Sequence, residues 1–294
     1  MKIKALFFAL LMLAATPVAA AGRPALVVEG VQMPAWVEHA NGARDPLAIG
    51  MALTNKDRIF TGPESRALLR LADGSLIKLG ENGLLALDDL GQKKIQLKDV
   101  VTASLDVVSG AFRFTTQALY KFHGERDVKV RIVTITAGIR GTDVWGKADS
   151  TRDIVCLIEG KITVARERDA FVMDQPLSFY IAPKNEPALP VAPVSQKQLD
   201  QWSLETDIAS GAGAMRKGGK WRVYVAAADN QGDALGIYEQ LRSAGYAAEI
   251  RPVKNASGTL YRVRISNLPG KPDAEALAGK LNGKMGIAEP KVSK

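Results

Sequence analysis

The sequence predicts two unlike domains, an all-β domain followed by an α+β domain, and three observations support this prediction. The chain has 294 residues, more than the roughly 150 residues of an average domain. Short runs of alternating polar and apolar residues, separated by turn residues, dominate 25–182, a pattern typical of a sandwich, a roll or a short β-helix. Residues 220–294 instead combine strand patterns with two helical ones, in the βαββαβ order of a ferredoxin-like sheet.

Residues 1–21 have the features of a secretory signal peptide. Two lysines open the segment, an apolar run fills 5–15, and small residues precede a cleavage position near Ala20 or Ala21. The apolar run is shorter than the roughly 20 residues that cross a bilayer as a helix. We therefore expect a periplasmic protein whose mature chain has no transmembrane segment. An uncleaved amino-terminal anchor is the alternative.

In the first domain, three consecutive strands are predicted at 66–71, 76–79 and 84–87. An Asp-Gly pair and an Asn-Gly pair lie near the two junctions, and both pairs accept the positive φ angles of tight turns. The same alternation predicts further strands at 128–136, 153–157, 161–165 and 177–180.

Several segments of this domain resemble the FecR domain family. They are VEG at 28–30 with AW at 35–36, DRIFTG at 57–62, LRLADGS at 69–75, ITAGIRGTD at 135–143 and EGKITV at 159–164. The resemblance covers roughly 25–164 and implies a periplasmic β-rich domain without known chemistry. The family is named after regulators that carry a signal across the inner membrane to a sigma factor, so a FecR-type signalling protein is one alternative. An unidentified envelope protein that binds the FecR-like domain is a further expected partner.

The residue inventory argues against a metal or cofactor site. Cys156 is the single cysteine, and it lies in an apolar run where a thiol is expected to be a small buried hydrophobe. His39 and His123 are the two histidines, and both are expected at the surface in turn-like surroundings. We predict no metal, no cofactor and no disulfide within the chain.

Two polar groups could suggest catalysis, but each has a simpler interpretation. The cluster Arg-Gly-Thr-Asp at 140–143 consists of turn-forming residues, so we expect a turn that joins two strands. Asp73 and Glu81 lie on neighbouring turns, where carboxylates are normally solvated rather than catalytic. We therefore predict no catalytic residues and no enzymatic activity.

Residues 183–219 are predicted to link the two domains. Repeated prolines in 183–193 exclude a helix or a central strand. Ser195 is a suitable N-cap for one short helix over 195–208. The glycines of 210–214 and 218–219 predict flexible chain.

The basic character of the protein is concentrated in its last quarter. The whole chain has a net charge of +8. Fourteen Lys or Arg and seven Asp or Glu follow Ala214, so this region alone carries +7. An excess of this kind indicates an anionic partner.

The last quarter contains the elements of the second domain in a regular order. Strands are predicted at 221–225, 246–250, 261–265 and 290–293, and helices at 233–244 and 272–282. Gly245 is placed to end the first helix, and a turn at 255–258 separates the two middle strands.

This segment resembles the SPOR domain family over 220–294. The resemblance is carried by WRVYV at 221–225, by the helix that ends at Gly245-Tyr246, and by YRVRI at 261–265. It implies binding to peptidoglycan glycan strands that have been stripped of their peptides.

Strand alternation then predicts the binding residues. Trp221, Val223 and Val225 point to one face of the sheet with Tyr261, Val263 and Ile265, and this apolar face must pack under the helices. The opposite, open face carries Arg222, Tyr224, Arg262 and Arg264. Guanidinium groups bind carboxylates in a bidentate way, and sugar rings stack on aromatic rings. The alternative is an ordinary solvated face.

Together these features predict a non-enzymatic periplasmic protein that binds denuded peptidoglycan through the SPOR-like domain and presents the FecR-like domain. The SPOR resemblance implies the division septum as the site of action. A peptidoglycan-remodelling enzyme is the second alternative, beside the FecR-type regulator. Nucleic acid is not expected as a partner, because Tyr261 on the central strand faces the apolar side.

Overall fold

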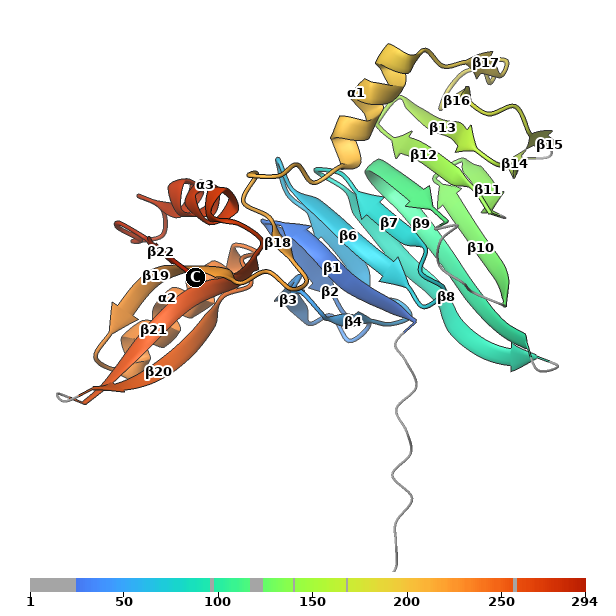
Figure 1. Cartoon of the computed structure of the whole chain (residues 1–294). Coiled ribbons are helices and arrows are strands. Elements are labelled where there is room, and N and C mark those ends of the chain that lie inside the picture. Colours follow the sequence, from blue (N-terminus) through green and yellow to red (C-terminus); the bar gives the residue numbers. More distant parts are fainter. Residues whose placement is uncertain (1–24, 96–97, 117–123, 140, 168, 256–257) are drawn as a thin grey trace, which may run out of the picture.

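The computed structural model describes residues 25–95, 98–116, 124–139, 141–167, 169–255 and 258–294 (Figure 1). It contains a large β domain and a smaller α+β domain, as the sequence predicts. The predicted signal peptide, His123 and Arg140 lie outside the described residues. Within the described ranges, none of the helices has the length and apolar character needed to cross a membrane.

The β domain consists of two sheets. The first sheet contains β1 (Leu26–Gln32), β4 (Ala52–Leu53), β6 (Arg66–Leu71), β7 (Leu76–Leu79), β12 (Asp143–Ala148), β13 (Arg152–Glu159), β16 (Ser178–Pro183), β17 (Ala192–Pro193) and β18 (Met215–Arg216). The second sheet contains β2 (Ala35–Glu38), β3 (Arg44–Pro46), β5 (Arg58–Thr61), β8 (Leu84–Ile95), β10 (Glu125–Ile132), β11 (Ile135–Ile139), β14 (Ile162–Arg166) and β15 (Asp169–Met173).

Strand β9 (Lys98–Thr115) belongs to both sheets and joins them. Its first half pairs with β8 in antiparallel and with β10 in parallel orientation, and its second half pairs with β7 and β12. The chain passes between sheets at Gly110, whose φ is +84°. A Cβ there would lie 2.7 Å from the Cα of Gly83, so only glycine fits the bend without strain.

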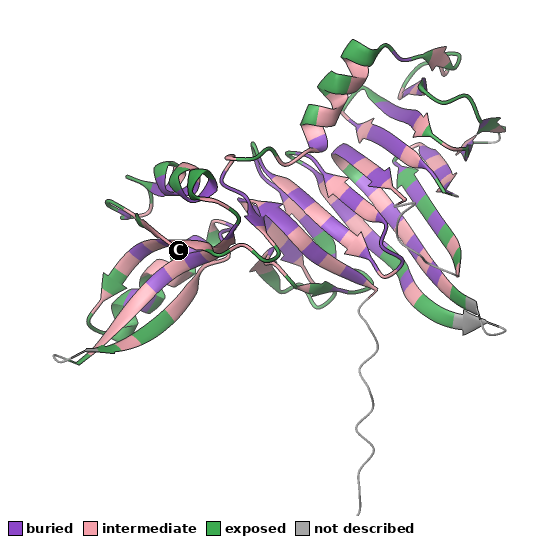
Figure 2. Ribbon diagram, viewed as in Figure 1, coloured by how far each residue is buried: buried purple, intermediate pink, exposed green. Residues whose placement is uncertain are grey.

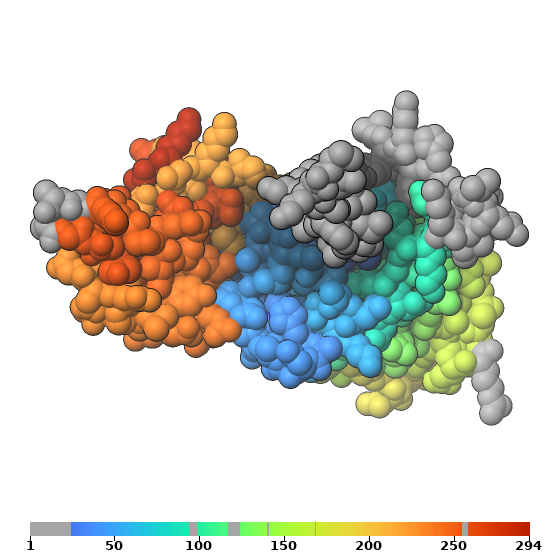
Figure 3. All heavy atoms as spheres, turned by 90° about the horizontal axis from the view of Figure 1, so that it is seen from below, coloured from blue at the N-terminus to red at the C-terminus, as the bar shows by residue number. Residues whose placement is uncertain are grey.

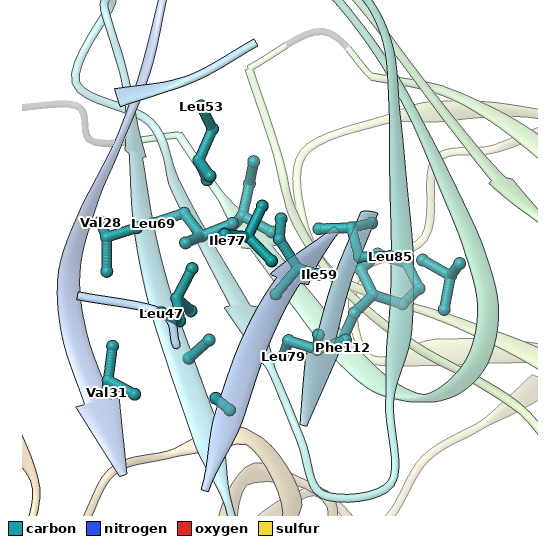
Figure 4. Close-up of a cluster of buried hydrophobic side chains, with 14 of the residues drawn as sticks. Val28, Val31, Leu47, Leu53, Ile59, Leu69, Ile77, Leu79, Leu85 and Phe112 are labelled. Atoms are coloured by element: carbon teal, nitrogen blue, oxygen red, sulfur yellow. The ribbon is translucent and has the colours of Figure 1, made fainter. Parts of the chain in front are cut away.

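The inner faces of the two sheets enclose one aliphatic core. Figure 4 shows Val28, Leu69 and Ile77 of the first sheet beside Ile59 and Leu85 of the second, and all five are fully buried. Buried and more exposed residues alternate along most strands (Figure 2), as expected for sheets with one face in a core. The domain is therefore a β-sandwich, one of the three all-β forms that the sequence allows.

Some predicted strands differ from those observed. The segment 128–136 forms two strands rather than one, because Val133 adopts a φ of +41° and Thr134 donates backbone and hydroxyl hydrogen bonds to the buried Asp153 carboxylate, at 2.9 and 2.6 Å. In the cluster at 140–143, Gly141 lies at a bend with a φ of +68°, and Asp143 already begins β12. Ten strands of the described ranges have no counterpart among the predicted ones: β1 to β5, β9, β12, β15, β17 and β18.

The segment 184–214, which we call the strap, first adds the short strand β17 to the first sheet and then packs its helix on the outer face of that sheet. Helix α1 (Gln196–Thr206) begins at Ser195, whose hydroxyl accepts a hydrogen bond from the Gln198 N–H at 3.2 Å. Its Trp202 stacks on Trp145 of β12, with ring centroids 4.5 Å apart. The linker segment is thus packed against the sandwich for much of its length.

The two segments predicted as flexible chain, 210–214 and 218–219, lie on either side of a short stretch that packs against the sandwich. Ala214 and Met215 are buried, and β18 pairs in antiparallel orientation with β1. Gly213 approaches the α+β domain closely, and its N–H donates to the carboxylate of buried Asp273 at 3.3 Å. The apolar side chain of Met215 explains the ordered path, because it enters the common core.

The α+β domain is a four-stranded antiparallel sheet in the order β20–β21–β19–β22. Its elements are β19 (Trp221–Ala228), α2 (Gln231–Ser243), β20 (Glu249–Asn255), β21 (Gly258–Leu268), α3 (Lys271–Leu281) and β22 (Lys291–Ser293). Val223, Val225, Val263 and Ile265 are buried in one core with apolar residues of both helices, as predicted.

One strand of this domain is displaced from its predicted position. We predicted 246–250, but β20 begins at Glu249. The Tyr246 N–H donates to Leu241 O at 2.9 Å and so completes the end of α2, and the Tyr246 ring is buried. The apolar character of Tyr246 therefore reflects packing of a helix terminus rather than a strand.

The end of α2 fastens the two domains together. Trp36 of β2 donates from Nε1 to Ser243 O at 3.2 Å, and the Ala35 N–H donates to Gly245 O at 3.1 Å. Arg242 forms an ion pair with Asp45 of β3 at 2.6 Å. Figure 3 shows the α+β domain in orange directly against the blue amino-terminal strands. The two domains thus meet over direct contacts and are not joined by the chain alone.

Candidate functional site

The four predicted binding residues lie together on the open face of the α+β domain. Tyr224 of β19 is paired directly with Arg264 of β21, and Arg262 is paired with Ala227 beyond a β-bulge. Each of the four side chains is partly exposed, whereas the valines and isoleucine between them are buried. Alternation along two adjacent central strands is what places them on one surface.

Tyr224 is the centre of this group. The Arg262 guanidinium carbon lies 5.6 Å from the centroid of the Tyr224 ring, which is cation–π geometry. Arg222 and Arg264 approach the phenolic oxygen. The pKa of Tyr224 is lowered from its ordinary value: burial opposes this shift, but hydrogen bonds and positive charge from Arg222 and Arg264 outweigh it. Three guanidinium groups therefore surround one phenol.

Glu249 of β20 is a member of the site that the sequence analysis missed. Its carboxylate accepts a hydrogen bond from Arg264 Nε at 2.8 Å and from Ser266 Oγ at 2.6 Å. Arg251 contributes Nε at 2.9 Å and a terminal nitrogen at 2.6 Å. The pKa of Glu249 is lowered: burial alone would raise it, and the bonds from Ser266, Arg264 and Arg251 more than compensate.

A signal for Glu249 exists in the sequence. Ile250 is apolar and packs toward the core, so its neighbours Glu249 and Arg251 must face the open side. The register confirms this reasoning, since Glu249 pairs with Arg264 and Arg251 pairs with Arg262. The signal was missed because the predicted strand ended at 250, before the charged pattern becomes visible.

Two hollows lie on this surface. The first, of about 580 Å³, is lined by Tyr224 and Arg262 together with Lys291, Glu289 and small residues of β19. The second, of about 540 Å³, has the lining residues Gly219, Lys220, Trp221, Arg222, Glu249, Arg264, Ser266, Asn267 and Lys294. Cations outnumber acids in both hollows, and Tyr224 lies between Arg262 of the first and Arg222 and Arg264 of the second. An extended anionic polymer fits this arrangement better than a compact ligand.

Comparison with known families identifies both parts of the chain. Residues 57–163 match the FecR protein family, and residues 217–292 match the SPOR domain family. The chain joins a FecR domain to a SPOR domain. The open face described above belongs to the SPOR domain, and the sandwich contains the FecR domain.

Solved structures with similarity to the chain include two crystal structures of a candidate anti-sigma factor from Parabacteroides distasonis. The first is 14% identical, with a TM-score of 0.40, and the similarity covers 71% of this chain and 99% of that one. The second is also 14% identical, with a TM-score of 0.38 and coverage of 76% and 89%. No curated protein matches the sequence closely enough to count as a relative.

The two families define the general role of the protein. A SPOR domain implies binding to peptidoglycan, and FecR and SPOR domains belong to envelope proteins. Both families are non-catalytic. Among the residues that the structure describes, no cluster of His, Cys, Asp and Glu side chains could hold a metal ion.

Three other residues that the sequence analysis singled out make structural contacts in the sandwich. Cys156 is fully buried, and burial raises the pKa of its thiol to about 12. His39 is partly exposed and bonds to Asp57 at 3.0 Å. The expectation that Asp73 is solvated is wrong: it is fully buried, accepts a bond from Ser75 Oγ at 2.7 Å and pairs with Arg126.

Proposed function

We propose that this chain is a non-enzymatic periplasmic protein that holds denuded peptidoglycan strands on the open face of its SPOR domain. The observation that carries the proposal is the gathering of three arginines around Tyr224 on a sheet face that the helices leave uncovered. The four residues come from two neighbouring strands, so the sheet itself fixes their spacing.

The chemistry of these side chains fits a glycan without peptides. Such a polymer exposes a lactyl carboxylate on alternate sugars, and guanidinium groups bind carboxylates by charge-assisted hydrogen bonds. The Tyr224 ring offers a surface on which a pyranose can stack. In the described part of the chain, neither Arg222 nor Arg262 has a carboxylate partner, so both are available to a ligand.

Location and partners complete the proposal. The predicted signal peptide at 1–21 would export the chain to the periplasm. Denuded glycan arises where amidases act, so the SPOR domain would bring the FecR domain to the division septum. There the FecR domain would be presented to an unidentified envelope protein. The alternative functions for the same pair of domains are a wall-remodelling enzyme and a FecR-type regulator.

A pulldown on purified sacculi tests the binding proposal. The mature protein should be retained on amidase-treated sacculi and much less on untreated ones. Equal retention on both would overturn the preference for denuded glycan. Release of soluble wall fragments by the pure protein would overturn its classification as non-enzymatic.

The double variant Arg222→Ala with Arg262→Ala tests the residues. We expect the dissociation constant for denuded sacculi to rise about tenfold or more, since a tenfold change corresponds to about 1.4 kcal/mol and each lost guanidinium removes charge-assisted bonds. The matched control is Lys271→Ala with Lys284→Ala, which removes the same charge from the α3 side of the domain. If both double variants weakened glycan binding equally, the effect would be explained by net charge alone and not by the arginines of the open face.

A further inference from the structure

We propose that Glu249 is a built-in competitor that occupies the arginine site in place of a ligand carboxylate. A glycan carboxylate must displace it before it can engage Arg264 and Arg251. This inference rests on the proposed function, and it assigns to one acidic residue the control of both affinity and selectivity at the SPOR face.

The contacts of Glu249 are those that a bound carboxylate would make. Oε1 accepts from Arg264 Nε at 2.8 Å and from Ser266 Oγ at 2.6 Å. Oε2 accepts both nitrogens of Arg251, at 2.6 and 2.9 Å. Three side chains thus converge on one carboxylate through hydrogen bonds, of which those from the two guanidinium groups are charge-assisted.

The position of Glu249 places it in the path of a ligand. Its side chain lines the second hollow together with Arg222 and Arg264, so a polymer that follows the face past Tyr224 reaches this carboxylate. The side chain is not deeply buried, since 30% of it is exposed. It can therefore move away when a stronger acceptor arrives, without opening the core.

The arrangement divides the arginines into two classes. Arg222 and Arg262 have no carboxylate partner among the described residues, whereas Arg251 and Arg264 share Glu249. A first ligand carboxylate can bind the unpaired arginines directly. A second can bind only by exchange with Glu249, and this exchange is favourable mainly when the two carboxylates belong to one chain, because the second contact is then intramolecular.

Selectivity follows from the exchange. A neutral polysaccharide offers no charge to replace Glu249 and leaves it in place. A polymer with regularly repeated carboxylates replaces the lost ion pairs with equivalent ones. The competitor therefore leaves the affinity for neutral sugars unchanged. It lowers the affinity for isolated carboxylates more than for carboxylates that repeat along one chain, because only the latter make the exchange intramolecular.

The experiment measures the affinity of the mature protein for fluorescently labelled denuded glycan strands. Glu249→Gln keeps the shape of the side chain and removes its charge, so we expect binding about five- to tenfold tighter than wild type. The matched control is Glu289→Gln, which removes one acid from the first hollow, where it has no ion pair among the described residues. This control should change affinity less than twofold. Thermal unfolding verifies that both variants fold.

A second probe separates exchange from general electrostatics. On strands whose carboxyl groups have been chemically reduced to alcohols, the gain of Glu249→Gln should disappear. Unchanged or weaker binding by Glu249→Gln, an equal gain in Glu289→Gln, or a gain that persists on reduced strands each overturns the inference and leaves the proposed function standing. Failure of the wild-type protein to bind unreduced strands would overturn the proposed function itself, and the inference with it.

Discussion

Tyr224 connects the arginines of the SPOR face through two different parts of one side chain. Its ring lies under Arg262, at 5.6 Å from the guanidinium carbon, and its hydroxyl oxygen meets Arg222 and Arg264. The phenol keeps like charges at a fixed separation and partly screens them from one another. Removal of Tyr224 would therefore disturb the arginines as a group and not only a stacking contact.

The ionisation of Tyr224 gives a direct test of this arrangement. Its pKa lies below the ordinary value of about 10, while burial raises the pKa of Tyr246. In an alkaline titration followed by phenolate absorbance, we expect Tyr224 to ionise early and Tyr246 late. The lowered pKa of Tyr224 stabilises the fold at pH values above the unfolded-state pKa of this tyrosine. That stabilisation is lost as the pH falls through its folded-state pKa.

Variants assign the two phases of the titration. Tyr224→Phe should remove the early phase, and Arg264→Ala should shift it to higher pH. An early phase that survives Tyr224→Phe would show that the arginines do not act on this phenol.

Alternation was sufficient to predict Arg222, Tyr224, Arg262 and Arg264 on one face, because sheet geometry alone fixes which side a residue faces. It could not predict that Arg264 is already paired. That fact depends on the register of β20 against β21, and the register is set by where α2 ends. Charge counted along a sequence therefore overstates the charge available to a ligand.

At the scale of elements, the strap converts an outer sheet face into a second, smaller core. Trp145, Ile154 and Cys156 point away from the main core and are nonetheless buried, because Trp202 of α1 and its neighbours cover them. Salt bridges at the edges hold the helix in place, including Lys147 with Glu205 at 2.7 Å. The strap is therefore a structural part of the sandwich.

Substitutions on α1 test its contribution. Trp202→Ala should lower the free energy of unfolding by about 2 kcal/mol, less than for a fully buried tryptophan because Trp202 is partly exposed. It should also accelerate modification of Cys156 by a thiol reagent. The control on the same helix is Leu204→Ala: this side chain is 72% exposed, and its loss should change stability by less than about 0.5 kcal/mol. Similar effects of both substitutions would contradict the packing role of the strap, as would unchanged thiol reactivity in Trp202→Ala.

The sequence predicted the helix of the strap and its Ser195 cap, since capping is a local property. It did not predict where the helix packs, because that depends on the stacking of Trp202 on Trp145, 57 residues earlier in the chain. Strand β9 was missed for a related reason. Its two halves serve different sheets on either side of Gly110, so a single strand pattern does not describe it.

At the scale of the whole molecule, the two domains are held by the end of α2 against β2 and β3. Gly245 has a φ of +81°, and a Cβ at this position would lie 2.6 Å from the Trp36 ring. Position 245 therefore requires glycine for two reasons. The end of α2 needs a positive φ, and the ring of Trp36 in the neighbouring domain leaves no room for a Cβ. Lys280 and Glu64 add an ion pair between the domains at 3.5 Å.

A pair of glycine variants separates these two requirements. Gly283 has a similar φ of +78° but nothing within 4 Å of a Cβ, so Gly283→Ala carries only the backbone strain, on the order of 1 kcal/mol. Gly245→Ala carries the same strain and a clash with Trp36. We expect Gly245→Ala alone to increase the maximum dimension in small-angle X-ray scattering and to expose the strap to proteases. Identical scattering profiles for the two variants would show that the contact with Trp36 does not hold the domains together.

The antiparallel pairing of β18 with β1 has a mechanical consequence. Tension applied to the carboxyl-terminal domain would reach the sandwich first through the pairing of β18 with β1. This pairing involves only two residues on each strand, so it is a weak seam that separates readily under load. The contacts of Trp36 and Arg242 lie beside that seam and would bear part of the pull. If the domains are pulled apart, this short pairing is where we expect their separation to begin.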